Sequence, residues 1–481
     1  MFDTLAGEKR DFVPQIEGHA GVYVCGPTVY DMAHIGHARA YVAFDTIVRF
    51  LRRHFKVTYV RNFTDVDDKI IRRAAELGEN PTAVSERFIV AFREDMARLG
   101  VLPADVEPKV TEHIDEIIAI TKTLVDAGFA YMSNGDVYYA VDRFAEYGKL
   151  AKRKRDDMDA GVRVEVSEIK RNPLDFALWK GAKEGEPFWD SPWGPGRPGW
   201  HIECSAMSRT YLGETFDIHA GGKDLIFPHH ENEIAQSEAA HGKPFARYWL
   251  HNGFVNIDNE KMSKSLGNFF TIRDVLKRFD PLTLRLYLLS THYRSPISFS
   301  DAGLQEAQNR LRYLMQTMAR LEASVTEGSI EGSMRAPWVS EMVDRFESAM
   351  ADDFNTPRVL GDLSEAFKLI NETIDQPGDR DVDARTLRVV FSHLKNIGSS
   401  IGLFEELSAD VLARLDTLEV SVAGIDPKVV DELVAARIKA RAEKDFVRAD
   451  EIRASIESMG VMIKDAGNTT TWEIKKTLPL E

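Results

Sequence analysis

Residues 21 to 60 constrain the fold of this chain more than any other segment. A short apolar run, Gly21–Cys25, ends at a helix breaker, and the stretch from Ile35 to Arg53 then carries apolar residues at helical spacing. A second apolar run follows at Lys56–Val60. Strand, helix and strand in this order predict a parallel βαβ unit, whose ligand site lies at the carboxyl ends of the strands.

Further along the chain, the pattern of apolar residues predicts six units. Asn134-Gly135 between alternating apolar residues is a strong hairpin signal, and it begins an irregular, polar stretch that interrupts the α/β pattern. Beyond Thr271 the periodicity is helical almost without a break to Phe404. We expect an α/β protein with a parallel-sheet domain in two halves (1–127 and 199–260), an insertion between them (128–198), a connecting region (261–310), an all-α bundle (311–405) and a small terminal module (426–481).

The charge and the cysteine content exclude several classes of protein. Among 481 residues, 61 Lys and Arg stand against 76 Asp and Glu, and the net charge of −15 disfavours indiscriminate binding of nucleic acid but allows local basic patches. Only two cysteines occur, which excludes a disulfide-stapled secreted fold. No apolar stretch approaches the ~20 residues of a membrane span, and no secretory signal is visible. We expect a cytoplasmic protein of about three domains with no membrane partner.

The sequence His34-Ile35-Gly36-His37 marks the point where the first predicted strand meets the first predicted helix. Backbone N–H groups and the helix dipole at such a start favour an anionic ligand such as phosphate. Gly36 lets a flat base approach the backbone, and the two imidazoles can donate to oxygens that gain charge. The alternative is a helix start that happens to contain two histidines, since motifs of four residues often match by chance.

A second short motif, Lys261–Ser265 with Gly267 close behind, combines two lysines with small polar residues. Such a composition predicts a mobile loop, from which Lys264 could stabilise a leaving pyrophosphate in the transition state. The alternative is a solvated basic loop. The phosphate-loop pattern GxxxxGK[ST] does not occur in the sequence, which disfavours a kinase or a P-loop ATPase.

Four residues carry side chains that zinc prefers. His229 and Glu233 are four positions apart and would share one helix face, while Cys25 and Cys204 supply thiolates that would complete a tetrahedral set. Each has an ordinary alternative, because a lone cysteine is usually a small buried hydrophobe and a helical His–Glu pair is usually surface polarity. Two neighbours point in other directions on the helix, and we expect them beside the metal at most: His230 and Glu231.

The two short motifs, in this order, resemble the HIGH and KMSKS signatures of class I aminoacyl-tRNA synthetases, which activate amino acids with ATP on a Rossmann-like fold. Longer stretches resemble the cysteinyl-tRNA synthetase family in particular: Tyr23–Asp31, Arg61–Lys69, Gly199–Met207 and Phe227–Glu233. The resemblance runs from Phe2 to Trp472. It implies a Rossmann-like catalytic domain, a terminal anticodon-binding module, and an enzyme that joins L-cysteine to tRNA(Cys) with ATP. We expect a monomer.

The resemblance also implies a role for each candidate residue. One Zn²⁺ per chain would bind the substrate sulfur, and Mg²⁺ would accompany ATP at a site that no residue identifies. The zinc ligands would be Cys25, Cys204, His229 and Glu233. The catalytic residues would be His34, His37, Lys261 and Lys264. The ATP site would comprise His34, Gly36, His37, Gly221, Gly222, Asp224 and Lys264, and the cysteine site Cys25, Gly26, Thr64, Trp200 and His229.

Two of these assignments have plain structural alternatives. Trp200 resembles the family's pocket tryptophan, but an aromatic residue beside a Pro/Gly turn usually packs in a core. The segment from Gly221 to Asp224 follows a predicted strand and resembles the family's ATP site, but its residues also suit an ordinary turn.

Cations recur along the predicted terminal module, with an aromatic side chain among them. Spaced cations and a stacking ring suit contacts to phosphate and to a base, and the resemblance implies that this module reads the tRNA anticodon. Interspersed acids favour instead a solvated helix face, and the sequence departs from the family at Thr469 and at Glu473-Ile474. The cations and the ring are Lys439, Arg441, Lys444, Arg448, Arg453, Lys464, Trp472, Lys475 and Lys476.

Three other functions would fit parts of this sequence, and a feature of the sequence disfavours each of them. A ligase that joins cysteine to an amino sugar resembles the same core but lacks an extended anticodon module, whereas this chain continues well past Gly402. A catalytically silent tRNA-binding paralogue would not need both motifs and all four zinc-type ligands. A zinc hydrolase would carry H-E-x-x-H, whereas His229–Glu233 has the sequence HHENE.

Overall fold

The computed structural model describes residues 1–153, 170–257, 260–261, 270–325, 337–376, 378, 380–466 and 469–474. Lys264 lies outside the described residues, and of Lys261 only the backbone is described. Within the described residues, no helix is both long enough and apolar enough to cross a membrane.

A four-stranded parallel sheet forms the centre of the α/β part. Its strands are β3 (His19–Val24), β4 (Lys56–Arg61), β9 (Phe216–Gly222) and β10 (Ala246–Asn252), and they lie in the order β10-β9-β3-β4. Val22 lies between Tyr59 of β4 and Ile218 of β9 in the register. The strand order reverses between β3 and β9, and such a reversal opens a crevice at the carboxyl ends of the strands. The predicted βαβ unit is confirmed, and it supplies one side of this crevice.

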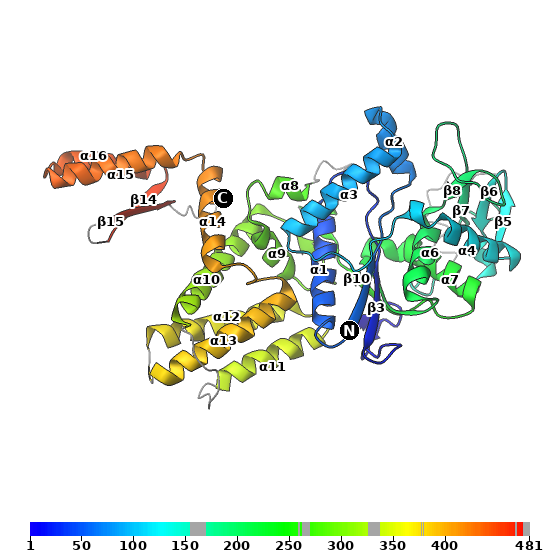
Figure 1. Cartoon of the computed structure of the whole chain (residues 1–481), viewed down its shortest axis with the longest axis horizontal. Helices are drawn as coiled ribbons and strands as arrows, with labels where there is room; N and C mark the ends of the chain where they lie inside the picture. The colour runs from blue at the N-terminus through cyan, green and yellow to red at the C-terminus, as the bar shows by residue number, and fades with distance from the viewer. Residues whose placement is uncertain are drawn as a thin grey trace.

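The helix α1 (Ile35–Leu51) joins β3 to β4 and is buried on nearly all sides. Its apolar residues pack against the sheet on one side, while α9 and α13 cover the other, so α1 lies in the middle of the molecule (Figure 1). Tyr41 of α1 donates its hydroxyl to the carbonyl of Cys25, 3.2 Å away, and so connects the helix to the end of β3.

An antiparallel sheet interrupts the α/β part, at the right of Figure 1. Its strands lie in sequence order: β5 (Ala130–Ser133), β6 (Asp136–Tyr139), β7 (Phe176–Gly181) and β8 (Gly196–Pro198). The predicted hairpin is confirmed, because Asn134 and Gly135 join β5 to β6 with φ of 51° and 87°. Three helices lie near this sheet: α4 (Ile114–Asp126), α6 (Trp200–Leu212) and α7 (Glu231–His241). Two further helices of the α/β part are α2 (Asp68–Leu77) and α3 (Pro81–Arg98), which pack on each other.

The chain beyond Thr271 is largely helical, as the periodicity predicts. The helices are α8 (Ile272–Val275), α9 (Pro281–Leu289), α10 (Asp301–Ser324), α11 (Pro337–Ala351), α12 (Thr356–Asp375), α13 (Arg380–Ile401) and α14 (Ser408–Val422). A short strand that the periodicity did not predict, β13 (Ile297–Ser298), pairs with β11 (Val255–Ile257). The remaining short strands are β1 (Phe2–Asp3), β2 (Glu8–Lys9) and β12 (Glu260–Lys261).

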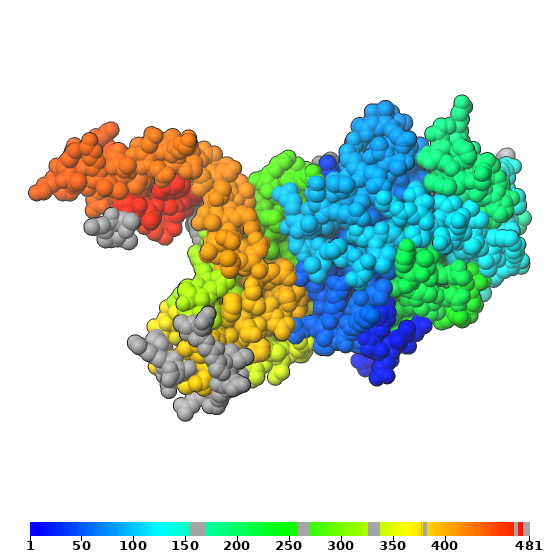
Figure 2. Space-filling view, viewed as in Figure 1, coloured from blue at the N-terminus to red at the C-terminus, as the bar shows by residue number. Residues whose placement is uncertain are grey.

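The last described residues form a small module with its own core. Two helices, α15 (Pro427–Ala442) and α16 (Phe446–Ser458), pack on the hairpin of β14 (Val461–Ala466) and β15 (Thr469–Ile474). The core is a separate cluster of Val430, Val434, Ile452, Ile456 and Val461. Figures 1 and 2 show this module projecting at one end of the molecule, far from the parallel sheet.

Candidate functional site

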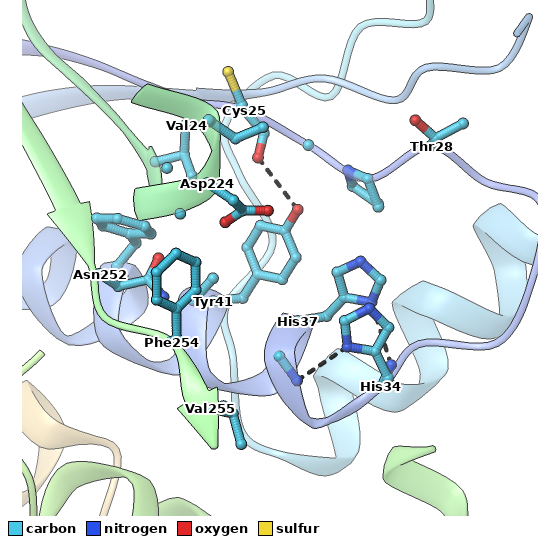
Figure 3. A pocket seen from close by; sticks show the side chains of 18 of the residues that line it. Val24, Cys25, Thr28, His34, His37, Tyr41, Asp224, Asn252, Phe254 and Val255 are labelled. Atoms are coloured by element: carbon cyan, nitrogen blue, oxygen red, sulfur yellow. Dashed lines mark hydrogen bonds between the residues drawn. The ribbon is translucent and has the colours of Figure 1, made fainter. Parts of the chain in front are cut away.

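A cavity of about 280 Å³ opens at the carboxyl ends of β3, β9 and β10, beside the first turn of α1 (Figure 3). Its lining includes most of the residues that the sequence predicts for the nucleotide and the amino acid. These are Cys25, Gly26, His34, Gly36, His37, Trp200, Gly221, Gly222 and Asp224. The structure therefore places these residues, from distant parts of the chain, around one hollow.

The two histidines of the HIGH sequence cap the helix that they begin. His34 Nδ1 accepts a hydrogen bond from the N–H of Gly36 at 3.0 Å, and His37 Nδ1 accepts one from the N–H of His34 at 3.2 Å (Figure 3). A neutral imidazole that accepts at Nδ1 carries its proton on Nε2. Both rings therefore have an Nε2–H to donate, and they stack with centroids 3.8 Å apart beside the cavity.

Other atoms approach the backbone closely at three glycines of the rim. A side chain at Gly26 would overlap the carbonyl of Asn62, and one at Gly221 would collide with the ring of His230. At Gly222 it would collide with the carboxylate of Asp224. The backbone of β9 thus reaches the cavity without side chains at its end, which leaves room for a ligand beside Asp224.

The four predicted zinc-type ligands lie together beneath this cavity, although they come from four elements. Cys25 Sγ lies 3.9 Å from Cys204 Sγ and 3.7 Å from Glu233 Oε1, and His229 Nε2 lies 3.0 Å from the same Oε1. Cys25 directly follows β3, Cys204 lies in α6, and Glu233 lies in the first turn of α7. His229 lies in the π-helical turn Ile226–His230 that precedes α7.

This donor set fits a zinc ion. A tetrahedral ion with Zn–S bonds of about 2.3 Å holds two sulfurs about 3.8 Å apart, close to the spacing of the two thiols here. All four side chains are buried, with Glu233 fully so. Burial raises the pKa of the Cys25 thiol and of the Glu233 carboxyl well above their ordinary values, and it lowers the pKa of His229 well below its own. Negative charge on these ligands therefore needs a cation to compensate it.

Four further histidines surround this set, and the sequence analysis predicted only one of them near it. His219 Nε2 lies 2.7 Å from Glu233 Oε2, and His201 Nδ1 lies 3.0 Å from His229 Nδ1. His230 Nε2 lies 3.3 Å from Cys25 Sγ, and its Nδ1 lies 2.8 Å from His251 Nε2. Burial lowers the pKa of His201, His219 and His251 to about 3, so these rings are neutral, and His201 and His219 orient the ligands that they contact.

Of the two helix neighbours expected beside the metal at most, His230 lies next to the donor set and Glu231 does not. His230 contacts a predicted ligand directly, and a second group of four donors within 4.8 Å of one another is Cys25, His219, His230 and Glu233. Glu231 turns away and accepts hydrogen bonds from the backbone N–H groups of Gly148, Leu150 and Ala151. It therefore connects the start of α7 to the insertion.

Trp200 and Thr64 lie on the side of the cavity near the donor set. The ring of Trp200 is 36% exposed, lines the cavity and stacks on His229 with centroids 4.3 Å apart, which contradicts the alternative of a core aromatic. Thr64 is buried and does not line the cavity; its hydroxyl donates to Glu203 Oε2 at 2.8 Å. Thr64 nevertheless pairs with Thr28, which does line the cavity.

The cations of the terminal module are largely paired within the module. Arg441 bonds Asp465, Arg448 bonds Glu451, and Arg453 bonds Glu457, each at 2.9 Å. Lys439 and Lys464 also have acidic partners, Glu443 and Glu473. Trp472 is not fully exposed: it packs against the module core and donates its indole N–H to Asp431 at 2.8 Å. Lys475 and Lys476 lie outside the described residues.

Comparisons with known proteins agree with this geometry. Residues 11–309 match the family described as "tRNA synthetases class I (C) catalytic domain". Residues 345–405 match the DALR domain, and residues 427–472 match the cysteinyl-tRNA ligase anticodon binding domain. The protein is therefore an enzyme of the class I aminoacyl-tRNA synthetases, as its fold and its HIGH histidines predict.

Relatives that match over the whole chain identify the family within this class. A cysteine–tRNA ligase of Geobacter metallireducens is 52% identical over 481 residues, and one of Anaeromyxobacter dehalogenans is 53% identical over 483 residues; 99% of each chain is covered. This chain belongs to the cysteine–tRNA ligase family. The fold is shared with Mycobacterium tuberculosis methionyl-tRNA synthetase in complex with methionyl-adenylate, at a TM-score of 0.60 and 16% identity over 85% of this chain and 94% of that one. The predicted family and fold class are confirmed.

Proposed function

We propose that this chain activates L-cysteine with ATP to cysteinyl-adenylate and transfers the cysteinyl group to the 3′ end of tRNA(Cys). The observation that carries this proposal is the single cavity that joins two Nε2–H donors of a helix start to a buried sulfur-rich donor set. The Nε2–H donors are suited to phosphate, and the buried donor set is suited to a thiol. Family membership supports the same reaction.

The residues that would hold one zinc ion are Cys25, Cys204, His229 and Glu233. When bound, zinc supplies affinity for the thiolate of the substrate. A site that senses sulfur against oxygen by shape alone gains only about 1–3 kcal/mol, and metal affinity for sulfur separates cysteine from serine more widely. The neutral histidines around the ligands keep their orientation fixed.

On the nucleotide side, His34 and His37 would donate from Nε2 to phosphate oxygens, with Gly36 beside them at the helix start. Gly221, Gly222 and Asp224 would contact the adenosine part. Lys261 and Lys264 would stabilise the leaving pyrophosphate; the described residues do not include their side chains. Mg²⁺ would accompany the ATP.

On the amino-acid side, Thr64 would recognise the backbone of the substrate cysteine and Trp200 would enclose it, beside Cys25, Gly26 and His229. The hydroxyl proton of Thr64 is engaged by Glu203. The lone pairs of the Thr64 oxygen are then what this residue can offer to another group, and an ammonium is a donor that matches them.

Both chemical steps then depend on positioning and charge stabilisation. In the first, a carboxylate oxygen of cysteine attacks the α-phosphorus of ATP and pyrophosphate leaves. In the second, a hydroxyl of the terminal adenosine of tRNA attacks the acyl carbon and AMP leaves. No nucleophile of the protein is needed, so the residues around the cavity orient substrates and donate to oxygens that gain charge.

The predicted domain boundaries stay part of this proposal. Residues 1–127 and 199–260 would form the two halves of the catalytic domain, with 128–198 as the insertion and 261–310 as the lysine-loop and connecting region. Residues 311–405 would form the bundle, and 426–481 would read the anticodon. We also propose a cytoplasmic monomer; a molar mass near 54.2 kDa in light scattering would support the monomer.

The test is ATP–pyrophosphate exchange with each amino acid in turn, followed by charging of purified tRNA with the amino acid that responds. We expect exchange with cysteine, negligible exchange with serine, and charging of tRNA(Cys). Exchange with cysteine but transfer only to an amino sugar would replace tRNA as the acceptor. Binding of tRNA without any ATP–pyrophosphate exchange would indicate a catalytically silent, tRNA-binding paralogue.

A further inference from the structure

Arg39 is a buried cation on the catalytic helix, and the proposed chemistry does not use it. It lies in α1, two residues after His37, and only 1% of it is exposed. Its guanidinium donates to four backbone carbonyls instead of a carboxylate. Burying a charge against neutral groups is costly, so such a contact needs a well-defined arrangement of acceptors.

All four carbonyls belong to one segment, residues 288–295, which ends α9 and leads toward β13. Nη1 donates to Leu288, and Nη2 donates to His292 at 2.6 Å, Thr291 at 3.1 Å and Ser295 at 3.3 Å. A planar guanidinium presents several N–H groups in a fixed fork, which a lysine cannot reproduce. Arg39 therefore fixes the path of segment 288–295 against α1.

The same segment forms the back of one wall of the cavity. The N–H of Gly253 donates to Tyr293 O at 2.7 Å, and the N–H of Ile297 donates to Phe254 O at 2.9 Å. A side chain at Gly253 would overlap the carbonyl of Ser295, one of the four that Arg39 holds. Residues 252–255 line the cavity on this side, across from His34 and His37 (Figure 3).

We propose that Arg39 is a positioning residue that fixes the wall 252–255 relative to the HIGH histidines and so sets the fit of ATP. It reaches one wall through segment 288–295, while its own helix carries the histidines. The two halves of the nucleotide site thus share one support. This inference rests on the proposed function, which places ATP in this cavity.

The cysteine side of the cavity does not depend on this support. Its residues come from the segments that follow β3 and β4, from α6 and from the turn before α7, and none of them bonds segment 288–295 in the hydrogen bonds of the described residues. Loss of the guanidinium should therefore disturb ATP far more than cysteine.

The experiment compares Arg39→Lys and Arg39→Met with wild type in ATP–pyrophosphate exchange, varying ATP and cysteine separately. For Arg39→Met we expect kcat/KM for ATP to fall by about 10–100-fold, because a small misplacement of reacting groups has effects of that size. KM for cysteine and bound zinc should stay within about twofold of wild type by the same argument. Arg39→Lys should fall between the two, and it carries the test if the Met variant does not fold.

Arg285→Met is the matched control. Arg285 is also fully buried and also donates to backbone carbonyls, Ile401 at 2.8 Å and Leu99 at 3.0 Å, but it lies against the far end of α1, where it bonds Asp45. Its loss should lower the melting temperature without changing the ratio of the two KM values. A milder control of the same kind is Arg310→Met, whose guanidinium bonds Leu360 and Ser364.

Each result of this experiment either supports the inference about Arg39 or overturns it. A change confined to ATP in the Arg39 variants supports the inference. Equal changes in both KM values, lower stability alone, or wild-type constants in Arg39→Lys and Arg39→Met overturn it. Absence of exchange with cysteine in the wild-type enzyme would overturn the proposed function instead, and the two failures are therefore distinguishable.

Discussion

The cavity and the terminal module present their chemistry in opposite ways. Beneath the cavity, the donors Cys25, Cys204 and Glu233 are buried away from water and face one another. In the module, cations such as Arg448 and Arg453 are exposed and already bonded to acids of the same helix. The donors of the first region are buried. The cations of the second region are exposed, and each would have to leave its acidic partner in order to bind a phosphate.

This difference teaches where specificity can be fixed. Buried donors cannot replace a lost partner with water, so the fold fixes their geometry. A single substitution among them therefore has a large effect on activity. Exposed ion pairs contribute only about 0–1 kcal/mol each, so a phosphate can replace a carboxylate at little cost. We therefore expect large effects of single substitutions in the cavity and small, distributed effects in the module.

The largest effect should come from Cys204→Ser. Replacing one thiolate by a hydroxyl weakens zinc binding and the recognition of the substrate thiol, so kcat/KM for cysteine in pyrophosphate exchange should fall by at least about 100-fold. Zinc per chain, measured by plasma mass spectrometry, should fall as well. Thr210→Ala, on the exposed face of the same helix, is the control. Unchanged kinetics with full zinc would contradict the proposed zinc site.

Next in size is Lys264→Ala. The lysine is proposed to stabilise charge on pyrophosphate only in the transition state, so the rate of exchange should fall by about 100–1000-fold while KM for cysteine changes little. Lys277→Ala, an exposed lysine bonded to Asp274, is the matched control. Exchange near the wild-type rate would remove the role proposed for the lysine loop.

A chain that ends at Gly424 separates the two regions directly. The core of the module is a separate cluster, so the deletion should leave cysteine activation unchanged. Charging of tRNA(Cys) should fall by about 10–100-fold, because the proposed phosphate contacts of the module would be lost, and its dependence on salt should become weaker. Equal charging by the shortened and the full chain would show that the module does not read tRNA.

The sequence was sufficient for residues whose chemistry is rare. Only two cysteines occur, and with His229 and Glu233 they form the donor group that the sequence singled out. The strand–helix–strand order likewise predicted the crevice, because a parallel pair fixes where its strands end. Such features depend on residue type and local periodicity, which the sequence carries directly.

Other parts of the site have no local signature. His219 and His251 lie in ordinary strands, and only the order of β9 and β10 in the sheet turns them toward the donors. Arg39 bonds backbone carbonyls about 250 positions away, and a carbonyl is the same for every residue type. These features follow from tertiary structure alone.

The smallest effect is expected for Asp465→Asn, within the module. Asp465 bonds Arg437 at 2.9 Å and Arg441 at 2.9 Å, and so connects α15 to β14. Because Asp465 itself is exposed, although Arg437 is buried, charging of tRNA(Cys) should fall by only about twofold, with pyrophosphate exchange unchanged. Hydrogen exchange of α15 and β14 should quicken slightly. Asp431→Asn, which weakens the bond from Trp472, is a matched change on the opposite contact of the same hairpin.

The pH dependence of this effect has a definite sign. The hydrogen bonds from Arg437 and Thr470 hold the pKa of Asp465 below its ordinary value, so the carboxylate is charged throughout the range from pH 5 to 8. Its stabilising contribution is present above the ordinary pKa and is lost only as the pH falls through the lowered one. The difference between wild type and Asp465→Asn should therefore be constant between pH 5 and 8. A difference that decreases within that range would mean that another group, with a pKa nearer neutrality, connects α15 to the hairpin. The stability of the module would then depend on pH in a range where the buried groups near the cavity do not titrate.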